Sequence, residues 1–164
     1  MITLRKIEPT DLPFLYQWEN DASAWADGSN HNPLSQQDLR DYIATTTGDI
    51  YRDGQLRLMI MQDGVTVGCA DLFDLDIRNR RAAIGLYIAP EYRGHGLGAQ
   101  AMDQLEQYAF DFLHLRLIYA VVAETNLACR KIYEGRNYMC SSPLRYWTLD
   151  SSALIYSKCH DYDD

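Results

Sequence analysis

The sequence predicts a single domain of the α/β class, with a central mixed, mostly antiparallel sheet and helices on both faces. Its 164 residues suit one compact domain. A hydrophobic fraction of 47% and a charged fraction of 23% are typical of globular domains. Strand-like and helix-like periodicities follow one another in the order β-α-α-β-β-β-α-β-α-β-β. Because no repeat or linker interrupts this order, we treat residues 1–164 as one domain.

The N-terminal segment predicts a strand and then a helix. Residues Ile2 to Ile7 alternate between apolar and polar, as in a short strand. Thr10 resembles a helix cap, and Pro13 falls in the first turn, where its missing N–H group costs little. The helix is expected to end near Asn20, with a buried face made of Leu12, Leu15, Tyr16 and Trp18.

A loop and a second helix are expected next. The stretch from Asp27 to Pro33 contains glycine, asparagine and proline, which indicates a loop. Ser35 and Asp38 have the spacing of a capping box, which marks the start of a helix. The apolar positions of this second helix are Leu39, Tyr42 and Ile43.

The pattern then changes from helices to strands. Leu56–Gln62 and Val65–Phe73 are predicted strands, joined by Asp63-Gly64, a dipeptide typical of tight hairpin turns. Arg81–Ile88 is the third strand of this run, and Pro90 ends it.

The C-terminal half predicts two helices and three strands. A helix from Leu97 to Leu113 is expected to face the core through Leu97, Ala101, Leu105, Ala109 and Phe112. Leu117–Val122 is almost wholly apolar, which predicts a strand buried on both faces. The remaining elements are a short helix at Asn126–Glu134 and strands near Tyr138–Ser141 and Tyr146–Ser157.

Charge and cysteine spacing exclude several classes of function. The net charge of -8 disfavours binding to nucleic acid and favours small cationic acceptors such as amines. No apolar run reaches the roughly 20 residues that cross a bilayer, and the N-terminus lacks the apolar core of a signal peptide. We therefore expect a cytoplasmic protein that binds no membrane. No metal site is expected, because the four cysteines form no C-x-x-C pair: Cys69, Cys129, Cys140 and Cys159.

The segment Arg93-Gly94-His95-Gly96-Leu97-Gly98-Ala99 carries the strongest chemical signal. It joins a strand to a helix, and its glycines let backbone N–H groups converge on an anion at the helix N-terminus. It also satisfies the dinucleotide pattern G-x-G-x-x-G/A, with Glu124 placed as a ribose-binding acid would be. Four residues separate the glycines from their strand, however, and 40 residues after Glu124 are too few for a doubly wound domain. We therefore expect a phosphate-binding loop of another kind.

On these residues the chain resembles the GNAT superfamily of acyl-CoA-dependent N-acyltransferases. Arg93, Gly96 and Gly98 match its signature Arg/Gln-x-x-Gly-x-Gly/Ala, and the order of elements matches along nearly the whole chain. A second match lies between Glu124 and Glu134, where Asn126 is followed seven residues later by Tyr133. The opening segment is similar to the branch that contains spermidine N-acetyltransferases and ribosomal-protein N-terminal acetyltransferases.

The resemblance implies an acetyl-CoA-dependent enzyme with direct attack in a ternary complex. Tyr133 would protonate the departing CoA thiolate, a task that suits a phenol because it stays protonated at neutral pH. Asn137 replaces the glycine usual in relatives, and asparagine tolerates the left-handed conformation there. The residues implied in acetyl-CoA binding are Leu86, Ile88, Arg93, Gly94, His95, Gly96, Leu97, Gly98, Ala99 and Asn126.

The general base stays open at the level of sequence. Many relatives carry a glutamate in the strand before the phosphate loop, whereas the segment 82–88 here contains no acid. Our hypothesis is deprotonation of the amine through ordered water. Covalent catalysis by Cys129 is disfavoured, because no histidine lies near it in sequence. The carboxylates that could instead act as the base are Glu19, Asp27, Asp71 and Glu124.

The acceptor is expected to be a primary amine. Residues 1–54 hold nine acids and four bases, and Trp18 could pack on a cationic chain, which favours a polyamine or basic peptide. A protein N-terminus of the ribosomal-protein type, an aminoglycoside-like amine and a non-catalytic acyl-CoA-binding module remain alternatives. Tyr- and Trp-rich C-terminal strands are compatible with a homodimer. The candidate acceptor residues are Glu19, Trp25, Asp27 and Glu124, and those for the ribose phosphate of CoA are Arg130, Lys131 and Arg136.

Overall fold

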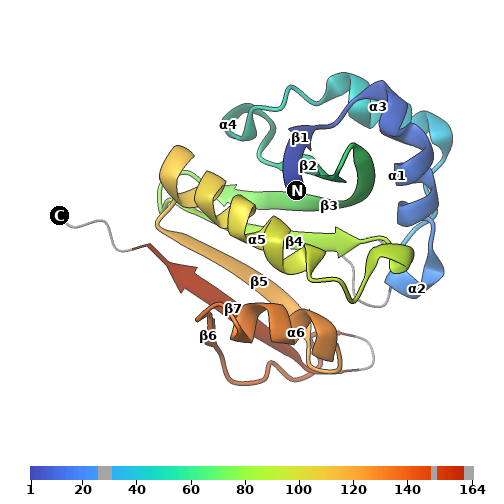
Figure 1. The fold of residues 1–164 in the computed structure, drawn as a ribbon. Coiled ribbons are helices and arrows are strands. Elements are labelled where there is room, and N and C mark those ends of the chain that lie inside the picture. The colour runs from blue at the N-terminus through green and yellow to red at the C-terminus, as the bar shows by residue number, and fades with distance from the viewer. Residues whose placement is uncertain (26–30, 149–150, 161–164) are drawn as a thin grey trace.

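The structure is a computed structural model that describes residues 1–25, 31–148 and 151–160. Its core is a seven-stranded sheet with the order β1-β2-β3-β4-β5-β7-β6, in which all neighbours are antiparallel except β4 and β5 (Figure 1). The fold class predicted from the sequence is thereby confirmed. The strands are β1 (Ile2–Lys6), β2 (Leu56–Gln62), β3 (Val65–Asp76), β4 (Arg81–Ile88), β5 (Leu117–Ala123), β6 (Met139–Cys140) and β7 (Ala153–Cys159).

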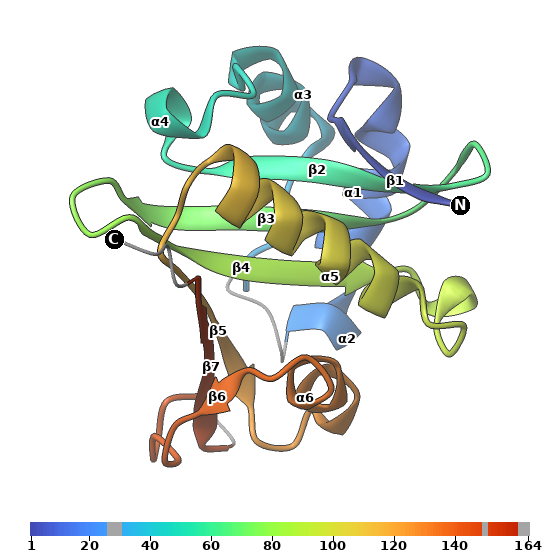
Figure 2. The ribbon, with the colours of Figure 1, turned by 60° about the vertical axis from the view of Figure 1, so that its left-hand side comes forward.

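Helices cover both faces of the sheet. Figure 2 shows α5 across one face of β3 and β4, with α1 and α3 on the opposite side. Each side has its own apolar cluster: Ala101 and Leu105 of α5 belong to one, and Leu15, Trp18 and Leu39 of α1 and α3 belong to the other. The helices are α1 (Leu12–Glu19), α2 (Ala22–Trp25), α3 (Gln36–Thr45), α4 (Ile50–Asp53), α5 (Leu97–Gln107) and α6 (Leu127–Glu134).

The parallel junction between β4 and β5 is short. Its described ladder comprises three pairs, from Arg81 opposite Leu117 to Ala83 opposite Tyr119. Strand β4 remains paired with β3 as far as Ile88, and β5 is paired with β7 along its whole length. The two strands therefore diverge after Ala83, and the sheet opens into two halves there (Figure 2).

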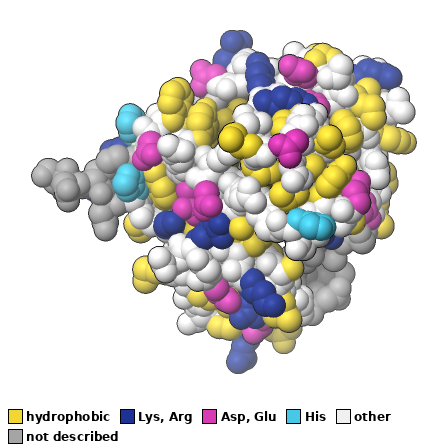
Figure 3. All heavy atoms as spheres, in the orientation of Figure 1, with side chains coloured by type: hydrophobic (Ala, Val, Ile, Leu, Met, Phe, Trp, Pro, Cys, Tyr) yellow, Lys and Arg dark blue, Asp and Glu magenta, His cyan; other side chains and the backbone are white. Residues whose placement is uncertain are grey.

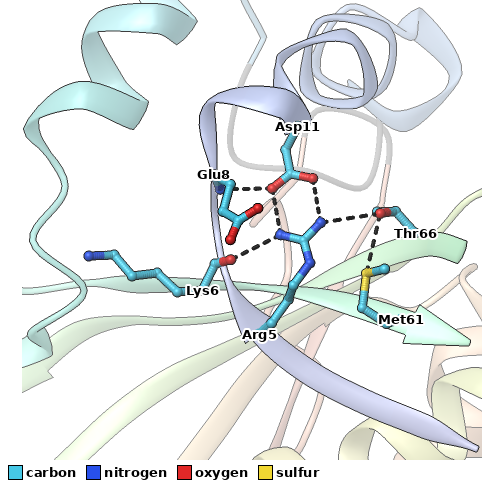
Figure 4. A network of polar contacts seen from close by, with 6 residues as sticks. All are labelled: Arg5, Lys6, Glu8, Asp11, Met61 and Thr66. Atoms are coloured by element: carbon cyan, nitrogen blue, oxygen red, sulfur yellow. Dashed lines mark hydrogen bonds and ion pairs between the residues drawn. The ribbon is translucent and has the colours of Figure 1, made fainter. Parts of the chain in front are cut away.

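The start of the first helix differs from the prediction. A 3-10 turn at Pro9–Asp11 precedes α1. The side chain that caps this turn is Asp11 rather than Thr10: its carboxylate accepts a hydrogen bond of 2.8 Å from the backbone N–H group of Glu8. The buried Asp11 carboxylate also accepts two bonds of 2.7 Å from the Arg5 guanidinium (Figure 4). This network ties β1 to the helix start.

Three predicted burial patterns also need correction. Tyr16 is 41% exposed, so the buried face of α1 is narrower than expected. Phe112 is 71% exposed, because α5 continues as a π-helical turn at Tyr108–Phe112 whose wider turn carries this ring away from the core. Strand β5 is buried on one face only, with Val121 at 41% exposure, because it lies in the half of the sheet away from α1 and α3.

The C-terminal strands are shorter than predicted. Strand β7 begins at Ala153 rather than at Tyr146, because Tyr146 takes a left-handed conformation and Thr148 and Ser151 bond one another in a turn. Strand β6 has two residues. The short helices α2 and α4 were not predicted, and β3 extends to Asp76, three residues beyond its predicted end.

Other local predictions are confirmed. Strands β2 and β4 have the predicted bounds, and Asp63 and Gly64 both have positive φ, as the tight hairpin requires. Ser35 and Asp38 cap α3 reciprocally, and Asn137 has φ of 59°. These positions share a local cause, since each depends on residues adjacent in sequence.

Candidate active site

The glycine-rich loop sits at the N-terminus of α5. It follows a 3-10 turn at Pro90–Tyr92, and Gly94 and Gly96 both take the left-handed conformation that glycine adopts without strain. Helix α5 then starts at Leu97, so the N–H groups of its first turn have no acceptor within the helix. The His95 side chain is exposed. This arrangement suits an anion held by backbone N–H groups and the helix dipole.

Arg93 fastens this loop to the end of β4. Its Nε donates to the carbonyl oxygen of Ile88 over 2.8 Å, and its guanidinium lies 5.6 Å from the centre of the Tyr87 ring. The third glycine of the motif has a packing function. A Cβ atom on Gly98 would lie 3.2 Å from both Leu86 and Ile132, so glycine lets α5 approach β4 and α6 closely.

The edge of β4 toward the diverging strands carries Leu86 and Ile88, both half-buried. Gly68 of β3 brings this edge close to its neighbour, because a Cβ atom there would stand 2.1 Å from the Tyr87 carbonyl oxygen. The edge lies beyond the last described pair of β4 with β5, which is where a peptide-like ligand can pair with a strand. The assignment of Leu86 and Ile88 to pantetheine stays a prediction.

Helix α6 holds the other two motif residues. Asn126 caps it by accepting a bond of 3.1 Å from the Cys129 N–H group. Tyr133 is only 2% exposed, and its hydroxyl interacts with the thiol of Cys129 one turn earlier. Burial raises the pKa of Tyr133 above its ordinary value, with a further contribution from the Cys129 thiol. Tyr133 is therefore a phenol at physiological pH.

Two further tyrosines enclose the Tyr133 ring. Its centre lies 5.0 Å from that of Tyr138 in an edge-on arrangement and 5.4 Å from that of Tyr156 in a stacked one. Tyr156 donates a hydrogen bond of 2.7 Å to Glu134, which anchors the stack to α6. Arg130 donates to the Tyr156 hydroxyl over 3.2 Å. Packing thus restricts the orientation of the Tyr133 ring.

A half-buried arginine lies on the face of the sheet that α1 and α3 cover. Arg57 of β2 binds Asp71 of β3 with two bonds, of 2.8 and 2.7 Å, and also pairs with Glu19 of α1. Asp71 in turn faces Gly85 of β4 in register. Sequence reasoning missed Arg57, because its partners stand 38 and 14 residues away and no motif links them.

This arrangement changes the interpretation of two candidate bases. Glu19 and Asp71 are not solvated surface carboxylates, since their side chains are 20% and 23% exposed and both pair with Arg57. Each carboxylate is already engaged by the Arg57 guanidinium, which holds its oxygens toward the sheet. The arrangement disfavours either group as the general base.

A hollow of about 390 Å³ opens beside Arg57 and Asp71. Tyr42 of α3 and Phe73 of β3 supply aromatic surface, and the polar lining includes three aspartates against one arginine. Burial raises the pKa of Tyr42, so it presents a neutral hydroxyl. On the face drawn in Figure 3, basic side chains are scattered among acidic and hydrophobic ones. The aspartates are Asp53, Asp71 and Asp74.

The structure separates the remaining predicted acceptor residues. Trp18 is buried at 6% exposure and belongs to the core, which corrects its predicted contact with an acceptor. The Trp25 indole donates to the Glu19 carbonyl oxygen over 2.8 Å and so holds α2 against α1. Glu124 is exposed at the end of β5. Asp27 lies outside the described residues.

The predicted phosphate-binding cations are mostly engaged within the chain. Arg130 donates to the Glu124 carbonyl oxygen over 3.0 Å, and Arg136 donates to the Ala99 carbonyl oxygen over 2.6 Å. Lys131 is exposed. Of these three cations, Lys131 is best placed to reach a phosphate outside the chain.

Three further features concern metal ions, membrane helices and exposed apolar surface. No group of three or more His, Cys, Asp or Glu side chains suited to a metal ion occurs among the described residues. In the same part of the chain, no helix combines the length and the apolar character needed to cross a membrane. Exposed apolar side chains gather near the C-terminus, where Met139, Tyr146 and Trp147 are 75%, 96% and 58% exposed, and self-association there stays a prediction.

Comparison with known proteins places this site in a family context. The family described as acetyltransferase (GNAT) domain matches residues 1–135. A spermidine N(1)-acetyltransferase of Escherichia coli (strain K12) is 27% identical over 88% of this chain and 76% of its own length. Bacillus subtilis (strain 168) YdaF, provisionally classed as a ribosomal N-acetyltransferase, is 30% identical over 84% of this chain and 78% of its own length.

Solved structures share the fold over nearly the whole chain. The spermidine N-acetyltransferase of Vibrio cholerae, in complex with CoA and spermine, superposes with a TM-score of 0.88 at 21% identity and covers 96% of this chain and 95% of its own. The ribosomal L7/L12 alpha-N-protein acetyltransferase RimL, in complex with coenzyme A, gives 0.83 at 16% identity and covers 99% and 96%. At these identities the likeness concerns the fold.

Proposed function

The chain belongs to the acetyltransferase (GNAT) family, and from this premise we propose that it transfers the acetyl group of acetyl-CoA to a polyamine such as spermidine. Membership makes it an acetyl-CoA-dependent N-acetyltransferase. The acceptor is the part that we propose. It is supported by the acidic hollow beside Asp71 and by the spermidine acetyltransferases among its relatives.

The hollow is the observation that carries the proposal. It begins at Asp71, which lies in register with Gly85 on β4, close to the edge expected to hold the thioester. Asp53 and Asp74 extend the hollow away from that edge, and they exceed its one cation, Arg57. A chain of two or more ammonium groups fits such a lining, with one amine near the thioester and another among the carboxylates.

The donor would be held by the loop and the β4 edge. Backbone N–H groups from His95 to Ala99 would bind the CoA pyrophosphate, and Arg93 keeps the loop fixed to Ile88. Pantetheine would pair with the edge at Leu86 and Ile88, with Asn126 orienting it or the acceptor. Backbone N–H groups at that edge would also stabilise the oxyanion that forms on the thioester carbonyl.

Acetyl transfer then needs three proton movements: one from the ammonium group before attack, one from the nitrogen after attack and one to the leaving sulfur. The neutral amine nitrogen attacks the thioester carbonyl carbon, forming a carbon–nitrogen bond and a tetrahedral oxyanion whose nitrogen carries one extra proton, which it loses to water. As the intermediate collapses, the carbon–sulfur bond breaks and the thiolate takes the proton of the Tyr133 hydroxyl. Tyr133 recovers its proton from solvent after CoA leaves.

The proton of the attacking ammonium would leave through water. Strand β4 supplies no carboxylate, and Glu19 and Asp71 both pair with Arg57. A water chain in the acceptor hollow would carry this proton to solvent. Under this proposal the two carboxylates help to bind the cationic acceptor and do not accept its proton.

A protein N-terminus is the second candidate acceptor. It is supported by the 30% identity to Bacillus subtilis YdaF and by the shared fold of RimL. A peptide would present one ammonium group to the thioester, and its remaining residues would need a longer surface than the hollow. A polyamine places all its charges within the hollow, so we prefer it.

The test is release of CoA from acetyl-CoA with four acceptors: spermidine, spermine, a peptide with an N-terminal Ser or Ala, and an aminoglycoside. We expect turnover with the polyamines at a kcat/KM at least tenfold above that with the peptide. A preference for the peptide or the aminoglycoside would overturn the proposed acceptor. Binding of acetyl-CoA, followed in parallel by thermal shift, reports the donor site separately from acceptor choice.

A further inference from the structure

An ion pair lies next to the stack formed by Tyr133, Tyr138 and Tyr156. Glu106 lies on α5 and Lys158 on β7, and Lys158 Nζ binds Glu106 Oε2 over 2.5 Å. The same ammonium group sits 5.5 Å from the centre of the Tyr138 ring, within the range of a cation–π contact. The edge of Tyr138 meets Tyr133. A continuous chain of contacts thus runs from Glu106 through Lys158 and Tyr138 to Tyr133.

The burial of Glu106 at this position costs folding stability. Its side chain is 12% exposed, and its second oxygen, Oε1, is the one buried side-chain polar atom without a hydrogen-bond partner in the described part of the chain. An unpaired buried oxygen costs stability, and an apolar side chain here would avoid that cost. A buried group that stability does not explain calls for a functional explanation.

The pair also joins the two halves of the sheet. Helix α5 packs on β3 and β4, whereas β7 belongs to the half that begins at β5 (Figure 2). The β4–β5 ladder holds these halves together by three residue pairs only. The loop expected to bind CoA lies at the start of α5, and Tyr133 packs against β7 through Tyr156. A tie between α5 and β7 therefore adds to the apolar cluster and to the Arg136–Ala99 bond in fixing the distance between the donor loop and the phenol.

We propose that Glu106 and Lys158 are positioning residues, whose ion pair holds Tyr138 and thereby fixes the Tyr133 hydroxyl relative to the CoA thiolate. This inference rests on the proposed function, since it assumes that Tyr133 is the acid. Neither residue touches the reacting atoms. Their effect is carried by the tyrosine stack and by the tie between the two halves of the sheet.

The test is a double-mutant cycle between Glu106→Gln and Tyr133→Phe, measured on acceptor turnover and on the slow hydrolysis of acetyl-CoA. We expect Glu106→Gln to lower kcat about tenfold, with the KM for acetyl-CoA within about twofold. In the Tyr133→Phe background the same change should have no further effect on kcat. Asp63→Asn is the control, because it removes an ion pair with the N-terminus in the hairpin turn between β2 and β3 and should leave kcat unchanged.

A second variant guards against misfolding. Glu106→Gln combined with Lys158→Met removes both charges together, which proteins tolerate better than one unpaired charge, and it should show the same loss of kcat. Two results would overturn this inference and leave the proposed function standing. One is that Glu106→Gln lowers kcat by the same factor in the wild-type and Tyr133→Phe backgrounds; the other is full activity of Glu106→Gln. Full activity of Tyr133→Phe would overturn the acid role in the proposed function and this inference with it.

Discussion

Arg57 decides the character of the acceptor face at the scale of single residues. Its two bonds to Asp71 and its ion pair with Glu19 gather one cation and two carboxylates where three separate elements meet. The cluster retains a net charge of one negative unit, so it attracts an ammonium group without offering a free base. Removing Arg57 would leave two carboxylates uncompensated, whereas removing one carboxylate leaves a neutral pair.

Asp74 allows the acceptor proposal to be tested with one atom changed. It lines the hollow and has φ of 49°, a conformation that asparagine tolerates, so Asp74→Asn removes charge without strain. One lost attraction of about 1 kcal/mol predicts a KM for spermidine raised about fivefold, with kcat nearly unchanged. The effect should shrink as salt is added, because screening weakens the wild-type attraction.

Asp63→Asn is the matched control for this measurement. Asp63 also has positive φ, of 50°, but it lies in the hairpin turn and pairs with the N-terminus. Steady-state kinetics of both variants with spermidine at low and high salt separates local from general charge effects. An equal KM increase in the two variants would contradict a specific contribution of the hollow.

At the scale of elements, the close packing of β3 on β4 prepares the donor site. Gly68 stands opposite Ile88 in register, and the Tyr87 carbonyl oxygen occupies the space that a side chain would need. Gly98 performs the same function between α5, β4 and α6. These two glycines explain how the strand end, the loop and both helices come together within one small region.

Gly68→Ala is therefore expected to damage both stability and donor binding. A Cβ atom 2.1 Å from backbone oxygen forces β3 and β4 apart, at a cost of about 2 kcal/mol in the free energy of unfolding. The KM for acetyl-CoA should rise, since the displaced segment carries Leu86 and Ile88. Gly85→Ala is the control, because its Cβ atom would meet ordinary contacts of 3.5 Å or more. Both variants are compared by urea unfolding and by acetyl-CoA titration. Equal stability and equal acetyl-CoA binding of the two variants would contradict this account.

The elements also show which predictions a sequence supports. Strands β2 and β4 and the cap of α3 follow from neighbouring residues, and each appears where predicted. Helices α2 and α4 have four residues each, too few to be stable without tertiary contacts, so no local pattern indicates them. The π-helical turn that exposes Phe112 is likewise invisible to a period of 3.6 residues.

The residues of the candidate site also fall into those that local sequence predicts and those that it does not. The loop at Arg93–Ala99 and the pair Asn126 and Tyr133 lie in continuous motifs, which is why the sequence points to them. The Glu106–Lys158 pair spans 52 residues, and the Arg57 cluster joins three elements. Such contacts depend on sheet order and register, which hydrophobic periodicity does not specify.

At the scale of the whole molecule, the divergence of β4 from β5 determines where chemistry can occur. One half of the sheet carries the glycine loop and the acceptor hollow, and the other packs against Tyr133. The buried tyrosines and Cys69 fill the interior on both sides of the sheet. Because these groups are neutral in the folded protein, they link the stability of the whole domain to alkaline pH.

The free energy of unfolding is expected to fall as the pH rises above about 9. Burial raises the pKa of Cys69 from 9.0 to about 12 and raises that of Tyr133, Tyr138 and Tyr42 above 10.0. The unfolded chain releases these protons first, so it binds fewer protons than the folded state and the slope of stability against pH is negative. Each group that is ionised only when unfolded contributes about 1.4 kcal/mol per pH unit. Urea unfolding at pH 8.0 and at about pH 10.5 measures the loss. Cys69→Ala should reduce the slope of the free energy of unfolding against pH by the contribution of one group. A flat profile, or a slope that this substitution leaves unchanged, would contradict the account, because it would show that the buried groups ionise as freely in the folded protein as in the unfolded chain.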